Sequence, residues 1–217
     1  MKKGFSFFVP ADQANFWSML KSEWYCHILN KTPLWNIPLR NYLVKKLFGS
    51  LDGVPYNIQR PFHCTYGKNI HIGKNFYSNF NCIILDQARV TIGDNCMFGP
   101  NVTIATTRHP MAADERRARA YKNSFAPGKL ADLELVSPVT IGNDVWLASG
   151  VTICPGVTIG DGAVIGAGSL VTSDIPANTL AYGVPCRAIR KITDADRLGV
   201  DVDQTIRKVH KGSYKDM

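Results

Sequence analysis

The most constraining feature of the sequence is a strict six-residue period between positions 141 and 171. An aliphatic residue opens each hexad, at Ile141, Leu147, Ile153, Ile159, Ile165 and Val171. The next position is small in each full hexad: Gly142, Ala148, Cys154, Gly160 and Gly166. A helix would need a period of about 3.6 and a simple strand a period of about 2. The hexads therefore indicate a coil of short strands joined by tight turns, which is typical of a parallel β-helix.

The geometry of such a coil predicts which residues stack in its core. Three six-residue sides make one triangular turn, so each inward residue should lie against the one eighteen positions later. We therefore expect Ile141 to stack on Ile159, Leu147 on Ile165, and Ile153 on Val171. Branched aliphatic side chains suit a narrow core because they have few rotamers, and small residues suit the corners.

Residues 1–56 lack the hexad period and are predicted to form a helical N-terminal cap. Apolar residues spaced by three and four predict a helix over residues 11–29, with Asp12 as a candidate N-cap. After a proline-containing break, residues 37–48 predict a second short helix. Two such helices cannot make a core alone, so we expect them to pack on the first turns of the coil.

The coil is expected to occupy residues 57–192, with one long interruption. Ile92, Phe98 and Ile104 follow the six-residue phase, which then stops until Ile141. The intervening residues 105–139 are polar and charged, and loops beyond about 15 residues are usually functional. We expect a loop extruded from the coil, with a helical turn near residues 112–120. Residues 193–217 are expected to form a charged C-terminal tail.

Composition and charge limit the kinds of partner and the cellular compartment that we expect for the protein. The net charge of +8 suggests an anionic partner, and a phosphate-bearing small molecule accounts for that charge as well as a nucleic acid does. The alternative is a basic surface that is simply solvated. No nucleic-acid-binding motif is present, so no nucleic acid is expected as a partner. No apolar run is long enough for membrane insertion. The apolar segment near the N-terminus is too short to be the core of a signal peptide, so we expect a cytoplasmic protein. The six cysteines lack zinc spacing and are expected to be free thiols.

An ordered set of motifs resembles the galactoside and maltose O-acetyltransferases, a branch of the hexapeptide-repeat acyltransferases. The likeness covers roughly residues 48–191. The motifs are Tyr77-Ser-Asn-Phe-Asn81, Ile92-Gly-Asp-Asn95, Pro100-Asn-Val-Thr103, His109-Pro110, Trp146, Pro155-Gly-Val-Thr-Ile-Gly160, Ile165-Gly-Ala-Gly168 and Gly183-Val-Pro-Cys-Arg187.

The resemblance implies a left-handed parallel β-helix assembled as a homotrimer, with active sites between subunits. Acetyl-CoA would donate an acetyl group to a sugar hydroxyl, and no metal would be required. The family's general base is the histidine of its His-Pro motif, here His109. Glu115 is a candidate for orienting that imidazole, although a solvated loop acid is the alternative.

The resemblance also implies an acceptor site. Tyr77, Asn79 and Asn81 match its contacts, and Asn79 would also stabilise the oxyanion, although turn-forming asparagines are common in β-helices. Asp86 and Gln87 occupy a position where the family often has two acids, so galactoside or maltose specificity does not transfer. Asp12 is a further candidate for the acceptor, with helix capping as the alternative.

Donor contacts implied by the resemblance lie along the coil and at its C-terminal end. The matching positions are Trp146, Ser149, Ala167, Thr172, Arg187 and Arg190, and the two arginines suit the phosphates of acetyl-CoA. A family lysine is replaced by Ser173, which removes one phosphate contact. Trp146 could equally pack against a neighbouring subunit.

The predicted function is therefore acetyl-CoA-dependent O-acetylation of a sugar or glycoside. A polysaccharide precursor and an antibiotic remain alternative acceptors. A metal hydratase is disfavoured because His63, His71 and His109 lie far apart in the sequence without paired spacing. The presence of His109 argues against a non-catalytic scaffold.

Overall fold

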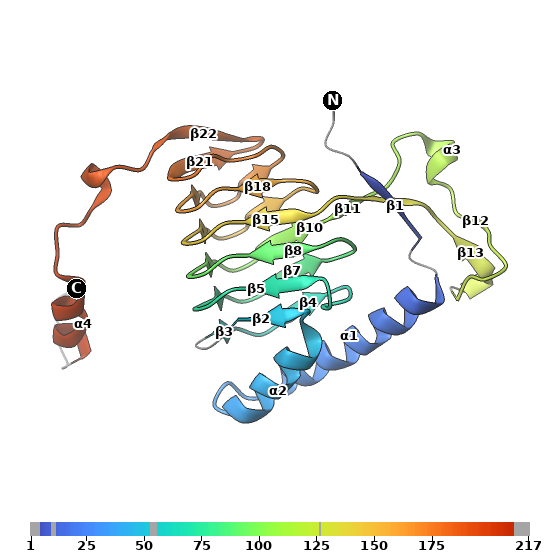
Figure 1. Cartoon of the computed structure of the whole chain (residues 1–217), viewed down its shortest axis with the longest axis horizontal. Coiled ribbons are helices and arrows are strands. Elements are labelled where there is room, and N and C mark those ends of the chain that lie inside the picture. Colours follow the sequence, from blue (N-terminus) through green and yellow to red (C-terminus); the bar gives the residue numbers. More distant parts are fainter. Residues whose placement is uncertain (1–4, 10–11, 53–55, 126, 211–217) are drawn as a thin grey trace.

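A computed structural model describes residues 5–9, 12–52, 56–125 and 127–210 and contains a parallel β-helix of about six turns. Figure 1 shows its turns stacked above the two N-terminal helices. One five-stranded side comprises β2 (Ser50–Leu51), β5 (Ile70–Ile72), β8 (Val90–Ile92), β15 (Val139–Ile141) and β18 (Thr158–Ile159). A second comprises β4 (Phe62–Cys64), β7 (Cys82–Leu85), β10 (Thr103–Ala105), β17 (Thr152–Ile153) and β20 (Leu170–Val171).

The third side is seven-stranded and closes the C-terminal end of the coil. It comprises β3 (Asn57–Ile58), β6 (Tyr77–Ser78), β9 (Met97–Phe98), β16 (Trp146–Leu147), β19 (Val164–Ile165), β21 (Thr179–Gly183) and β22 (Cys186–Lys191). The pair β21–β22 is antiparallel, so the chain turns back there and ends the spiral. A 3-10 turn, η2 (Asp194–Asp196), and the helix α4 (Val202–His210) follow.

The predicted stacking of the core is confirmed in register. Ile141 pairs with Ile159, Leu147 with Ile165, and Ile153 with Val171. These side chains are buried, with exposed fractions of at most 1%. Because a strand side chain alternates between faces, each short strand sends its aliphatic residue inward and its neighbour outward. All six cysteines have free thiols, as expected.

The coil keeps its register across the long loop. Ile92 pairs with Ile141, and Phe98 with Leu147, as one turn stacks on the next. These partners are 49 positions apart (141 − 92), which exceeds the eighteen-residue turn by 31. The loop therefore leaves from the end of β10 and returns to the start of β15 without displacing either strand.

We call residues 106–138 the arm. They contain β11 (Thr107–Arg108), α3 (Ala113–Arg116), β12 (Arg119–Ala120), η1 (Pro127–Lys129), β13 (Leu130–Ala131) and β14 (Glu134–Val136). The short helix α3 falls within the helical turn predicted near residues 112–120. An N-terminal strand, β1 (Ser6–Phe8), pairs antiparallel with β14, which also pairs with β11. In Figure 1 the arm projects from the coil and β1 crosses it.

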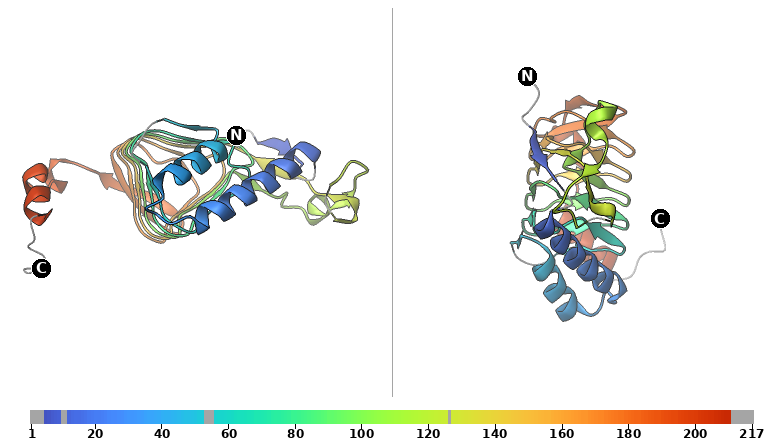
Figure 2. Two further views of the ribbon diagram at one scale, coloured as in Figure 1. Left: turned by 90° about the horizontal axis from the view of Figure 1, so that it is seen from below. Right: turned by 90° about the vertical axis from the view of Figure 1, so that its right-hand side faces the viewer.

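Two helices cap the N-terminal end of the coil, as expected. They are α1 (Gln13–Lys31), which starts two residues later than predicted, and α2 (Ile37–Leu47). The side chain of Asp12 accepts a hydrogen bond from the Ala14 amide, which confirms it as the N-cap. Figure 2 shows both helices across the end of the coil, where they cover its core. Apolar residues from both helices join that core: Cys26, Leu29, Leu43, Val44 and Leu47.

Polar side chains fasten the cap to the first turn. Asn30 donates to the carbonyl of Phe62 and accepts from its amide, each at 2.9 Å, so one side chain satisfies both groups of that residue. Arg40 is buried and donates to the carbonyls of Leu29 and Thr32 at the end of α1 and of Ile58 in β3. Buried backbone carbonyls need such partners, so these bonds make the docking specific.

The corners of the coil explain why small residues recur in the hexads. A Cβ atom added to Gly142 would lie 2.7 Å from the backbone nitrogen of Asp161 on the next turn. At Gly168 the limit is conformational, because its φ of +68° is in the left-handed region while nothing lies within 4 Å of an added Cβ.

Alanine substitutions at these two glycines distinguish the cost of close packing from the cost of backbone strain. Gly142→Ala should lose about 2 kcal/mol or more, because backbone atoms of two turns must move apart. Gly168→Ala should lose about 1 kcal/mol, because only the left-handed conformation opposes it. Urea unfolding followed by circular dichroism measures both. Equal losses, or a smaller loss for Gly142→Ala, would contradict the packing argument.

Candidate functional site

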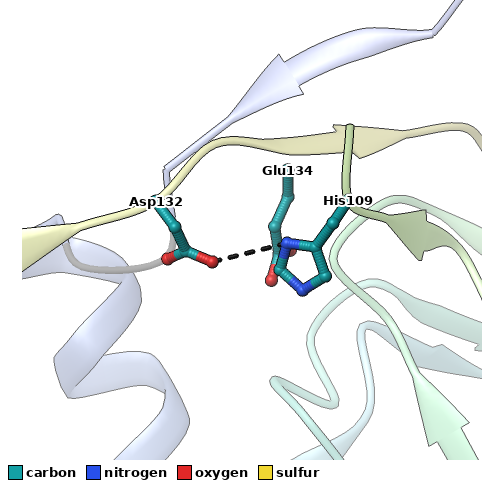
Figure 3. A group of neighbouring side chains, drawn as sticks. All are labelled: His109, Asp132 and Glu134. Atoms are coloured by element: carbon teal, nitrogen blue, oxygen red, sulfur yellow. Dashed lines mark ion pairs between the residues drawn. The ribbon is translucent and has the colours of Figure 1, made fainter. Parts of the chain in front are cut away.

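His109 lies directly after β11, on the arm, and faces two carboxylates from the returning strand. Its Nδ1 atom is 3.4 Å from Oδ2 of Asp132, and Figure 3 shows this contact with Glu134 beside it. Nearly half of the His109 side chain is exposed, whereas Glu134 is buried. The imidazole is thus held on one edge by acids and open to incoming molecules.

Glu134 is tied to the strand that carries His109. Its Oε2 atom accepts a hydrogen bond of 2.8 Å from the Thr107 hydroxyl. Burial raises the pKa of Glu134, while this hydrogen bond and the attraction of His109 oppose the rise. The carboxylate is therefore kept close to the imidazole by β11 itself. Ligand atoms of His109, Asp132 and Glu134 lie within 4.8 Å of one another, so the three could also bind a divalent cation.

Neither Asp132 nor Glu134 was predicted from the sequence. The signal was present in Asp132-Leu-Glu134-Leu-Val136, where polar and apolar residues alternate as in a strand with both acids on one face. Glu115, the expected candidate for orienting His109, lies in α3. It lines a hollow with Phe7, Arg108 and Leu135, whose positions in the paired strands put them on the face opposite Glu134.

The N-terminal strand braces this side of the arm. Phe8 pairs in register with Glu134, and its ring lies 5.9 Å from that of Tyr66 on the coil. Arg108 stacks on Phe5, with its guanidinium 4.3 Å from the ring centroid. Farther along the arm, Phe125 lies 5.9 Å from Phe16 of α1. The arm that carries the imidazole is therefore braced by β1 and by the start of α1.

Two of the predicted acceptor residues lie on another side of the coil. Tyr77 is in β6 and Asn79 follows that strand, on the seven-stranded side, whereas His109 leaves from the five-stranded side that contains β10. Both Tyr77 and Asn79 are half-buried. Among the described residues, no hydrogen bond or ion pair joins either of them to His109. One chain thus does not bring these residues together.

Asn81 has a structural role in the corner that follows. Its φ is 59°, and its side-chain amide donates to Oδ1 of Asn101 on the next turn at 3.1 Å. Asparagine tolerates the left-handed conformation, so such ladders stabilise successive corners. Asp12, besides capping α1, lines a hollow with Tyr121, Lys122 and Phe125 of the arm.

Asp86 lies beneath the surface of the chain. It is fully buried and accepts hydrogen bonds from the amides of Tyr66 at 2.8 Å and Asn69 at 3.3 Å. Burial raises the pKa of Asp86 to about 6, although these backbone bonds oppose the rise. This geometry makes Asp86 a support for the turn at residues 66–69. The neighbouring Gln87 has a buried Oε1 atom without a hydrogen-bond partner in the described structure.

The predicted donor residues lie at two corners of the coil and at its C-terminal end. Trp146 is on the outer face of β16 and is 52% exposed. Ser149 and Ala167 occupy the same corner on successive turns, where the Gly168 amide donates to the Ser149 carbonyl at 2.8 Å. Thr172 follows β20 and is exposed, as are both arginines of β22.

Arg190 already has an anionic partner within the chain. Its guanidinium donates to both carboxylate oxygens of Asp196, at 2.6 and 2.8 Å. This pair lowers the pKa of Asp196 to about 2. Within the part of the chain that the structure describes, Arg187 donates to the carbonyl of its neighbour Cys186 and is paired with no carboxylate, so its guanidinium is the more available of the two.

Comparisons with known proteins agree with this architecture. The family model "Bacterial transferase hexapeptide (six repeats)" matches residues 138–173, and "Hexapeptide repeat of succinyl-transferase" matches residues 89–107. Galactoside O-acetyltransferase from Escherichia coli (strain K12) is 49% identical over 158 residues, covering 73% of this chain and 71% of that protein. The chain belongs to the hexapeptide-repeat acetyltransferase family.

Solved structures of this family superpose on most of the chain. A galactoside acetyltransferase in complex with coenzyme A has a TM-score of 0.77 and 41% identity, covering 88% of each chain. A maltose O-acetyltransferase from Clostridium difficile 630 has a TM-score of 0.78 and 39% identity, covering 88% of this chain and 94% of the other. The predicted left-handed β-helix is thereby confirmed, and the chain is an acyltransferase. No helix in the described ranges is long and apolar enough to span a bilayer.

The buried carboxyl of Asp86 predicts a pH dependence of stability. Its pKa of about 6 in the folded state exceeds the unfolded value of about 3.9, so the folded state binds more protons between those values. Stability should therefore fall as the pH rises from about 4 to about 6, by about 2 to 3 kcal/mol for this group. Asp86→Asn should flatten that slope in urea unfolding. Asp161→Asn, at an exposed corner, should keep it; an unchanged slope in Asp86→Asn would contradict the assignment.

Proposed function

We propose that this protein transfers an acetyl group from acetyl-CoA to a hydroxyl of a sugar or glycoside, with His109 as the general base. The observation that carries the proposal is the contact between Asp132 and Nδ1 of His109, on an imidazole that is 46% exposed. Coenzyme A in the related galactoside acetyltransferase structure supports the donor. The names of the galactoside and maltose relatives support the class of acceptor.

The chemistry requires a proton to leave the hydroxyl as its oxygen attacks the thioester carbonyl. With Nδ1 facing Asp132, Nε2 is the ring atom available to accept that proton and to return it to the departing thiolate. The nearby carboxylates of Asp132 and Glu134 would stabilise the imidazolium that forms in between. A site that holds charge in this way favours the transition state over the bound substrate.

The site is completed by a second subunit in this proposal. Tyr77 and Asn79 lie on a different side of the coil from His109, so a neighbouring copy would supply them to each imidazole. Asn79 would then stabilise the oxyanion, and Tyr77 and Gln87 would contact the acceptor. A homotrimer with three equivalent sites satisfies this arrangement.

The donor would lie against the corner that carries Trp146, Ser149 and Ala167 and would reach Thr172 at the next corner, beyond β20. Main-chain groups at these corners suit the amides of the pantetheine arm, and Arg187 suits the phosphates. Arg190 would have to exchange its bond with Asp196 for a bond to phosphate. The long arm would border the acceptor cleft and would influence which acceptor fits. A polysaccharide precursor or an antibiotic is the alternative acceptor within the same chemistry.

His109→Ala should lower kcat by roughly 10²- to 10⁴-fold, the usual contribution of a general base. Folding should be unchanged, because nearly half of the side chain is exposed. Thiol release from acetyl-CoA with a panel of sugars, and mass spectrometry of the acetylated product, measure this loss. Turnover equal to that of the parent enzyme would refute the base.

Asp132→Asn should lower kcat by roughly 10- to 10²-fold, because a misplaced base loses its alignment with the hydroxyl. The KM for acetyl-CoA should stay constant, since Asp132 contacts His109 and is not one of the proposed donor contacts. Glu115→Gln is the matched control on the opposite face of the arm and should retain activity. Loss of activity in both variants would indicate a general effect on the arm instead of a specific one on His109.

A further inference from the structure

The outer surface of the helical cap is unusually rich in exposed aromatic residues. Three of the four tryptophans of the protein lie between positions 17 and 35. Their exposed fractions are 57% for Trp17, 57% for Trp24 and 80% for Trp35. We call the outward apolar surface of α1, α2 and their connection the cap face; it comprises Trp17, Leu20, Trp24, Trp35 and Tyr42. Leu34 and Ile37 are also exposed, but they line a hollow with Asn57 and Tyr77 of the coil and are not part of it.

Packing on the coil does not explain the cap face. The side of α1 that meets the coil carries Ser22, Cys26 and Leu29, which are buried. Trp17, Leu20 and Trp24 follow the spacing i, i+3 and i+7 and make a second apolar stripe on the same helix. Figure 2 shows the two helices at the end of the coil, with nothing of the described chain beyond them. An apolar surface of this kind marks an interaction site.

The charges around the cap face are mostly positive. Exposed lysines at positions 21, 31, 45 and 46 accompany a single exposed acid within the two helices, Glu23. The ammonium groups of Lys21 and Lys46 each lie 5.9 Å from a tyrosine ring centroid, of Tyr25 and Tyr42. Helices that lie in the interface of an anionic bilayer typically carry tryptophan residues beside lysines.

We propose that the cap face binds the surface of a membrane containing anionic lipids, without any segment crossing it. The exposed indoles would enter the headgroup layer, and the lysines would pair with lipid phosphates. Two copies meeting through the cap face would set lysines against lysines, so charge favours an anionic surface over self-association. The coil axis would then stand away from the membrane, because the helices lie across its end (Figure 2).

Sedimentation with lipid vesicles tests the proposal directly. The whole protein should bind vesicles of phosphatidylcholine mixed with phosphatidylglycerol, and should bind pure phosphatidylcholine vesicles at least 10-fold more weakly. High salt should weaken binding to the anionic vesicles, because it screens the lysines. Equal binding to the two kinds of vesicle, or no binding to either, would overturn the proposal.

Two double variants locate the surface. Lys45→Ala with Lys46→Ala should weaken binding by roughly 25-fold, from about fivefold for each lysine. Trp24→Ser with Trp35→Ser should weaken it by roughly 10-fold or more, because two indoles no longer enter the lipid. Matched controls away from the cap face are Lys74→Ala, on the coil, and Leu198→Ser, after η2; both should bind as the parent does.

Folding and assembly are followed in the same samples by circular dichroism and light scattering. The cap-face variants should keep the parent's secondary structure and molecular mass. A lower mass in either double variant would show that the cap face joins copies of the chain, and would overturn the lipid proposal. Equal loss of vesicle binding in the controls would do the same, since binding would then not depend on this surface.

Discussion

Stacking of inward aliphatic side chains, one turn on the next, is the interaction on which the rest of the structure depends. Each turn places one such residue per side against its counterpart below, as in the pair Ile141 and Ile159. Hydrophobic burial and parallel strand pairing act through the same residues, so register and packing reinforce each other. The corners can then be very tight, and only glycine or another small residue fits where two turns nearly touch, as at Gly142.

Such a column has two open ends and must be covered at both. The antiparallel pair β21–β22 ends the spiral at one end, and α1 and α2 cover the other. Arg40 and Asn30 show how the second cover is made specific, since each uses a side chain to satisfy backbone groups across the junction. Covering the core leaves a helix surface on the outside, and the aromatic residues of that surface are not needed for this task.

The regular half of the chain was predictable, whereas the irregular half was predictable only in outline. The hexads specify the stacking partners because period and geometry determine them together. The excursion of residues 105–139 could be located by the failure of that period, but not its internal pairing. Asp132 reaches His109 because β14 pairs with β11 inside the arm. β14 also pairs with β1, which lies more than 100 positions earlier in the chain. Local patterns hold no information about such pairings until the strands are known. Asp86 shows the converse, since a motif position implied for the acceptor lies buried in the scaffold.

The uninterrupted register across the arm has an evolutionary consequence. Since Ile92 and Ile141 remain stacked despite 31 additional residues between them, the coil tolerates insertions at the end of β10. The arm can lengthen, shorten or change its sequence by mutation while the edge that carries Trp146 and Ser149 keeps its shape. In the proposed mechanism, selection could therefore alter which alcohol is modified without rebuilding the groove for the activated acyl group. A lineage of such enzymes would diversify at one loop and remain conservative elsewhere.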